Sequence, residues 1–150
     1  MIRFLSEPKE SAYKSLLDMA FKVCSRFILV ERHQFTLSDN GKELLDLLKP
    51  FLIEIKVQQE WPATKLLHHY ANVYYYTVCD EAKELLIRYS TGLYSWLDPN
   101  LPEDLCFFKD ESVVWLTSIA HEEDSWIDNL TDDEANTIIS IEGLEYEILP

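Results

Sequence analysis

Residues 101–124, LPEDLCFFKDESVVWLTSIAHEED, bring together a cysteine, a histidine and several carboxylates around an apolar hairpin. A cysteine nucleophile activated by a histidine requires the sulfur and the imidazole to lie within hydrogen-bond distance. If Lys109–Ser112 form the hairpin loop, Cys106 faces Trp115, and His121 then lies about 20 Å further along the strand at ~3.3 Å per residue. The spacing excludes a Cys106–His121 dyad within this hairpin and predicts a buried core thiol.

The far end of the same hairpin is where acid–base chemistry is expected. Glu103 and Asp104 lead into the first strand, while His121 and Glu122 follow the second. Strand pairing brings these groups to one end of the hairpin, and a carboxylate beside an imidazole favours the protonated ring. The four residues are therefore the candidate catalytic residues of a small hydrolase or transferase. A rim histidine hydrogen-bonded to a turn is the structural alternative.

Metal and cofactor sites are not predicted. His68 and His69 are adjacent, so they point apart on a strand or helix and cannot chelate as a pair. A calcium loop that starts at Asp124 would enclose Trp126 and Ile127, and it lacks a glycine at its sixth position. No GxGxxG, Walker A, GxSxG or HExxH pattern occurs. We expect no metal and no cofactor, and the enzyme hypothesis has no specific motif behind it.

The net charge of −14 is concentrated in the second half of the chain. Residues 1–75 carry ten Lys and Arg against nine Asp and Glu, whereas residues 76–150 carry three against eighteen, a net of −15. Such a charge repels phosphate backbones, so no nucleic acid is expected, and it favours a basic protein partner. Acidic residues would steer association and aromatic anchors would supply binding energy. The expected contact residues are Glu122, Glu123, Asp124, Trp126 and Trp96. Acidity that serves solubility alone is the alternative.

Length and composition predict one α+β domain over residues 1–150, since 47% hydrophobic and 13% aromatic residues suffice for a single core. Glu7, Lys9 and Glu10 interrupt the first apolar stretch, and no apolar run approaches the ~20 residues that span a bilayer. The three cysteines lack CxxC spacing. We expect a cytoplasmic protein with no membrane segment.

Apolar spacing and capping residues predict a mixed or antiparallel sheet with about four helices packed on it. The helices are expected over 9–24, from a cap at Ser38 or Asn40 to 48, over 80–97 (bent or split near 91–92) and over 132–141, where Thr131 and Glu134 have the spacing of a capping box. The strands are expected over 26–31, 51–57, 72–79, 105–108, 113–120 and 144–148. The strand at 51–57 alternates and is expected to be half-buried, whereas the central hairpin 105–120 is apolar on both faces.

Several segments are distinctive in combination: Glu60-Trp61-Pro62-Ala63-Thr64, Leu93-Tyr94-Ser95-Trp96, Leu101–Phe107 and Trp115–Glu122. With them the chain resembles a group of small soluble proteins from Bacillus and its relatives, some of which carry the label stage III sporulation protein AH-like. The resemblance covers residues 60–149 and, more loosely, the N-terminal third. It implies a sporulation-associated structural factor.

Size and acidity are also similar to those of bacterial immunity proteins. The leading hypothesis is therefore a non-enzymatic acidic interaction protein, such as an immunity-type inhibitor that binds a basic protein. A sporulation-associated factor and a small hydrolase or transferase are the alternatives.

Overall fold

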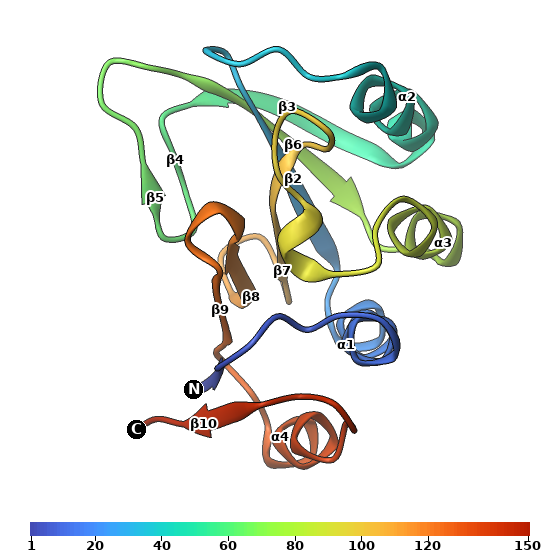
Figure 1. The fold of residues 1–150 in the computed structure, drawn as a ribbon, viewed down its shortest axis with the longest axis vertical. Helices are drawn as coiled ribbons and strands as arrows, with labels where there is room; N and C mark the ends of the chain where they lie inside the picture. The colour runs from blue at the N-terminus through green and yellow to red at the C-terminus, as the bar shows by residue number, and fades with distance from the viewer.

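An antiparallel sheet of eight strands forms the centre of the structure, and four helices pack on one of its faces (Figure 1). The computed structural model describes residues 1–150. The strands of the large sheet, in spatial order, are β10 (Tyr146–Ile148), β1 (Ile2–Phe4), β9 (Asp124–Ile127), β8 (Val114–Ile119), β7 (Glu103–Phe108), β2 (Arg26–Arg32), β6 (Ala71–Thr77) and β3 (Leu52–Gln58). A separate two-stranded hairpin consists of β4 (Glu60–Trp61) and β5 (Thr64–Lys65).

The helices are α1 (Ser11–Val23), α2 (Asp39–Leu48), α3 (Asp80–Tyr89) and α4 (Asp132–Ile139), and the short 3₁₀ turns are η1 (Lys49–Phe51), η2 (Leu93–Ser95) and η3 (Ala120–Glu122). The predicted α+β class with four helices on a sheet is confirmed. The sheet is antiparallel in all its pairings rather than mixed. None of the helices has both the length and the hydropathy that a bilayer crossing requires.

Local capping chemistry positions two of the helices. The Ser38 hydroxyl accepts a hydrogen bond from the Gly41 N–H at the start of α2. Thr131 and Glu134 form a capping box at the start of α4, as the sequence pattern predicts. Both devices satisfy N–H groups that have no partner inside the helix.

The two faces of the large sheet are buried by different elements. Side chains on the helix-covered face form a core cluster of 23 buried residues. On the opposite face a smaller cluster of seven is covered in part by the β4–β5 hairpin, whose Trp61 is buried there (Figure 1). Cys106 belongs to this second cluster, and burial raises the pKa of its thiol. The prediction of an inert core cysteine is confirmed.

The register of the central hairpin differs from the predicted one. Phe108 pairs with Val114 and Phe107 with Leu116, with a register shift between the two pairs. Cys106 is therefore displaced beyond Trp115 instead of facing it. A bulge inserts a residue without breaking the apolar pattern, and this is why strand arithmetic alone misses it.

Four short strands and one helix end also depart from expectation. β1, β4, β5 and β9 were not predicted, because strands of two to four residues give too little alternation to detect. The helix expected over 80–97 is split: α3 ends at Tyr89 and η2 follows after Gly92. The split turns the segment after Gly92 into the interior of the molecule, where Leu93 and Trp96 are completely buried.

The strand at 51–57 is present as β3, but it is not half-buried. It is the last strand of the sheet, and Ile53, Ile55 and Val57 are 46%, 48% and 61% exposed. Apolar alternation predicts a strand with a covered face, whereas here a cavity separates Ile55 of β3 from α2.

Candidate functional site

The candidate acid–base residues lie where β7 begins, and a bulge positions them. β7 pairs with β2 through Ile28 and Cys106, but the next pair, Val30 with Glu103, is shifted by one residue. Asp104 within this bulge has a φ of +57°, which a non-glycine residue rarely adopts. Bulges re-aim side chains at strand ends, and here Glu103 and Asp104 are both directed into buried surroundings.

Asp104 is fully buried and is held by three hydrogen bonds. Its Oδ2 accepts from the Trp61 Nε1–H at 2.8 Å, and its Oδ1 accepts from the backbone N–H of Ala120 at 3.0 Å. Its own N–H donates to the Trp96 carbonyl at 3.2 Å. Burial raises the pKa of Asp104, although the two donors act in the opposite direction. The carboxylate connects the β4–β5 hairpin to η3, and the backbone N–H adds the segment after η2, so the first role of Asp104 is structural.

Glu103 forms a buried ion pair with Arg32. The Arg32 Nε donates to Glu103 Oε2 at 2.8 Å, and the two side chains are only 12% and 4% exposed. The Arg32 guanidinium also lies 5.3 Å from the centre of the Trp61 ring, within cation–π range. Burial raises the pKa of Glu103 while the charge of Arg32 opposes that rise. Sequence reasoning missed Arg32 and Trp61 as site residues. Trp61 belongs to the distinctive segment Glu60–Thr64, but only the fold brings it and Arg32 here.

His121 is the exposed member of the group. It lies in η3, and single ligand atoms of Glu103, Asp104 and His121 all lie within 4.8 Å of one another. No hydrogen bond joins the imidazole to either carboxylate; its nearest ion-pair contact is from Nε2 to Glu122 Oε1 at 3.8 Å. The structure thus brings the predicted residues together without forming an acid–base dyad.

Two cavities flank His121. The larger, of about 440 Å³, is lined by Arg32, Phe35, Leu97, Asp98, Pro99, Glu103 and His121. The smaller, of about 250 Å³, lies between His121, Glu122 and the β4–β5 hairpin. Burial raises the pKa of Asp98 in the first cavity, and the charge of Glu31 adds to that effect. The larger cavity combines apolar walls with carboxylates, which suits a ligand with an apolar stem and a polar or cationic head.

The same three ligand atoms could meet at a metal ion only against competing contacts. Both oxygens of Asp104 already accept N–H bonds, and one oxygen of Glu103 accepts from Arg32. A cation placed among them would face the Arg32 guanidinium directly. The arrangement is that of a buried ion pair with its hydrogen bonds rather than of a metal centre.

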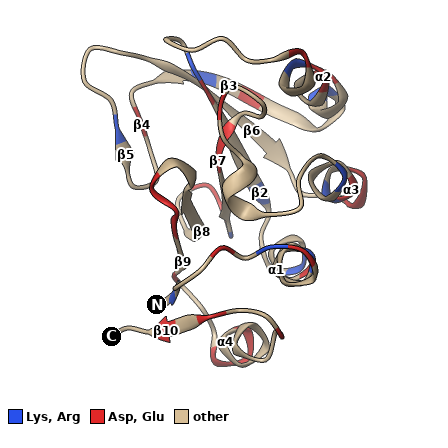
Figure 2. Ribbon diagram, viewed as in Figure 1, with Lys and Arg blue, Asp and Glu red and all other residues tan.

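The expected partner-binding residues are distributed over exposed and buried positions. Glu122 and Glu123 are exposed, and Asp124 pairs with Arg3 at 3.1 Å. Figure 2 shows acidic residues along this segment and again on α4 and near β10. Trp126 is partly buried on β9, opposite Arg3.

Trp96 cannot serve as a surface anchor. It is completely buried in the main core, and its Nε1–H donates to the Tyr13 hydroxyl at 3.0 Å. The prediction is wrong because the segment after Gly92 turns inward instead of continuing as an exposed helix. A large aromatic residue in a short apolar run is more often a core residue than an anchor.

No family model matches this chain, and comparisons with curated proteins and with solved structures find no match either. The resemblance to the sporulation-labelled bacterial group stays a prediction.

Proposed function

We propose that the protein is a non-enzymatic interaction protein that binds a basic protein partner through exposed acids of its second half. The observation behind this proposal is how few of those acids are neutralised within the molecule. Twelve Asp and Glu follow Lys109, the last basic residue. Only four of them form ion pairs with Lys or Arg: Glu111, Asp124, Glu134 and Glu147.

The eight acids that remain are available to a partner. They are Asp110, Glu122, Glu123, Asp128, Asp132, Asp133, Glu142 and Glu145, and all are exposed except the partly buried Asp128. Uncompensated like charge at a surface raises the association rate of an oppositely charged partner, and added salt screens that gain. A basic surface is therefore the complementary chemistry.

The alternative of a small hydrolase or transferase is less well supported. A cavity does lie beside His121, but Glu103 and Asp104 are occupied by Arg32, Trp61 and Ala120. General acid–base catalysis uses a side chain within hydrogen-bond reach of its proton partner. The enzyme alternative stays a prediction, as do the immunity-type inhibitor, the sporulation-associated factor and the cytoplasmic location.

The test is affinity capture from the source cells with the tagged protein as bait, followed by salt titration of the purified complex. Neutralising Glu122 and Glu123 together to glutamine should weaken binding several-fold at low salt and by much less at high salt. The matched control neutralises two exposed acids of the first half, Asp46→Asn with Glu60→Gln, each of which pairs with a nearby lysine. Partner binding that ignores both salt and the Glu122/Glu123 change would overturn the proposal.

A further inference from the structure

β3 forms one of the two outer edges of the large sheet. One side of β3 pairs with β6 from Leu52 to Gln58, and no strand lies on its other side. Backbone N–H and C=O groups that point outward along an edge strand are free to pair with another strand. Seven residues make this edge longer than the opposite one, where β10 has three.

The side chains of β3 do little to block such pairing. Proteins protect sheet edges with prolines, short strands or outward lysines, but β3 exposes Ile53, Ile55 and Val57 instead. Its one lysine, Lys56, is held on the strand itself: Nζ lies 3.5 Å from Glu54 Oε1 and 5.2 Å from the centre of the Tyr75 ring. The contact also shows that Glu54 and Lys56 share one face of the sheet.

We propose that β3 is a self-association edge, where two copies of this chain pair antiparallel about a twofold axis at Ile55. In that register Ile55 faces Ile55 of the second copy, and Glu54 faces Lys56 of the second copy. Directly opposite residues in an antiparallel pair lie on the same face and interact. Two ion pairs therefore form on one face. On the other face the two Ile55 side chains meet, and each Val57 lies opposite Ile53 of the second copy, at the end of β3 where its pairing with β6 shifts.

The partner is a second copy because the strand is complementary to itself. Negative and positive residues stand at equal distances on either side of Ile55, which a twofold axis requires. The other edge lacks this property: Glu145 and Glu147 near β10 have no basic counterpart there, and Arg3 of β1 already contacts Glu147 at 3.6 Å. β10 paired with itself would oppose like charges.

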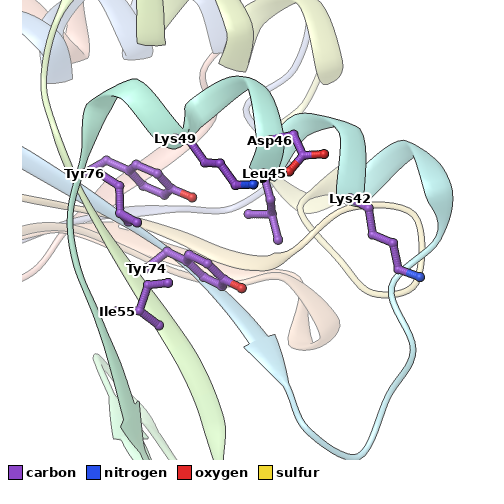
Figure 3. A pocket seen from close by; sticks show the side chains of 8 residues that line it. Lys42, Leu45, Asp46, Lys49, Ile55, Tyr74 and Tyr76 are labelled. Atoms are coloured by element: carbon purple, nitrogen blue, oxygen red, sulfur yellow. Dashed lines mark ion pairs between the residues drawn. The ribbon is translucent and has the colours of Figure 1, made fainter.

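An apolar groove extends the seam on the helix-covered face. A cavity of about 370 Å³ lies between α2 and the strands β3 and β6, and its lining includes Leu45, Leu52, Ile55 and Tyr74. Figure 3 shows Ile55 beside Tyr74 on the sheet, with Leu45 of α2 and Lys49 of η1 above them. Because Ile55 faces both the groove and the proposed axis, pairing would cover the open side of this groove.

The first test measures the mass of the purified protein over a range of concentrations by light scattering and sedimentation. The expected result is a concentration-dependent shift from 17.6 kDa to twice that mass. Ile55→Lys should remain monomeric at every concentration, because a lysine would then face a lysine across the axis. The matched control is Leu67→Lys, which changes another exposed apolar residue, 73% exposed and outside β3, and should dimerise like the parent.

The second test establishes the register by exchanging charges. Glu54→Lys and Lys56→Glu should each weaken dimerisation about tenfold, because each turns two attractive pairs into repulsive ones. The double exchange Glu54→Lys/Lys56→Glu should restore the parent affinity, and a mixture of the two single variants should form a heterodimer. Both positions of this cycle are exposed on the edge strand. Folding is therefore checked by the melting temperature at a protein concentration where the parent and all variants are monomeric, since dimerisation itself raises the melting temperature.

Three outcomes overturn the proposal: a parent protein that is monomeric at every concentration, an Ile55→Lys variant that still dimerises, or a double exchange that fails to restore association. Pairing of β3 with a different protein would appear as the first of these. The proposal is independent of the acidic surface, because Glu122→Gln with Glu123→Gln should leave dimerisation unchanged.

Discussion

Two pairs of adjacent acidic residues at the same end of the central hairpin differ in burial and in their contacts. Glu103 and Asp104 are buried at the start of β7, while Glu122 and Glu123 are exposed after β8. The first pair is hydrogen-bonded or ion-paired by Arg32, Trp61 and Ala120, whereas no Lys or Arg pairs with the second. Residues of equal charge therefore have different roles. Glu103 and Asp104 stabilise the fold, whereas Glu122 and Glu123 contribute to the negative electrostatic potential at the surface.

The comparison predicts large stability effects for the buried pair, beginning with Asp104. Asp104→Ala leaves the Trp61 Nε1–H and the Ala120 N–H without acceptors in a buried site, so the free energy of unfolding should fall by about 3–5 kcal/mol. Urea denaturation measures this fall. Asp104→Gly loses the same contacts but tolerates the φ of +57°, so it should be about 1 kcal/mol more stable than the alanine variant. A loss below about 1 kcal/mol for alanine would show that the Asp104 carboxylate does not anchor the β4–β5 hairpin and η3.

Arg32 comes next in expected size. Arg32→Met leaves the buried Glu103 carboxylate unpaired and should lower the free energy of unfolding by about 3 kcal/mol. Adding Glu103→Gln removes the orphaned charge and should recover most of that loss, because a buried ion pair is often replaceable as a unit. A double variant no more stable than Arg32→Met would mean that Arg32 acts through its packing on Trp61 rather than through Glu103.

The pH dependence of the free energy of unfolding should distinguish the buried Asp104 from Glu134, which is ion-paired with Lys109. The pKa of Asp104 is raised above its ordinary 3.8 by burial, so its stabilising contribution is present below that pH and is lost as pH rises through the folded pKa. Burial also raises the pKa of Glu134, but hydrogen bonds from Lys109 and Trp115 outweigh it, and the net pKa lies below 4.5. Its contribution is present above that pH and is lost on acidification.

Matched amide variants should show these opposite slopes. The stability difference between the parent and Asp104→Asn should narrow as pH rises from about 4 to 7, whereas the difference between the parent and Glu134→Gln should widen. Urea midpoints measured across this range give both curves. If the two stability differences changed with pH in the same direction, the opposite pKa shifts of Asp104 and Glu134 would be contradicted.

The exposed pair should show the smallest effect on stability. Glu122→Gln with Glu123→Gln should change the free energy of unfolding by no more than about 0.5 kcal/mol, since neither residue has a buried contact to lose. The same variant should still lose salt-dependent partner binding. A large destabilisation would show that Glu122 and Glu123 stabilise the fold as Glu103 and Asp104 do. It would then remove the main support for an acidic binding surface.

Periodicity and capping predicted most of the regular elements. Ser38, Thr131 and Glu134 act locally, so their roles can be read from neighbouring residues. The β1 and β9 strands, the bulges of the central hairpin and the exposure of β3 were missed, because each depends on what lies across the sheet. Trp96 shows the same limit. A tryptophan can be either a core residue or a surface anchor, and only the inward turn of the chain after Gly92 buries this one.

The residues of the candidate site were likewise only partly predictable from the sequence. Strand order along the chain was enough to expect Glu103, Asp104 and His121 at one end of the hairpin, because a hairpin couples residues that are close in sequence. Arg32 and Trp61 reach that end from β2 and β4, elements whose neighbours no local pattern specifies. Their contacts decide that the two carboxylates are occupied.

By itself, the sequence determined the α+β class, the core thiol and the concentration of negative charge in the second half, because composition and periodicity act locally or sum over residues. The tertiary structure alone decided which acids are buried and paired, which edge of the sheet is open and which tryptophans are inaccessible. Burial and pairing depend on contacts between distant segments. The chemistry of a carboxylate depends on those contacts more than on its neighbours in the chain.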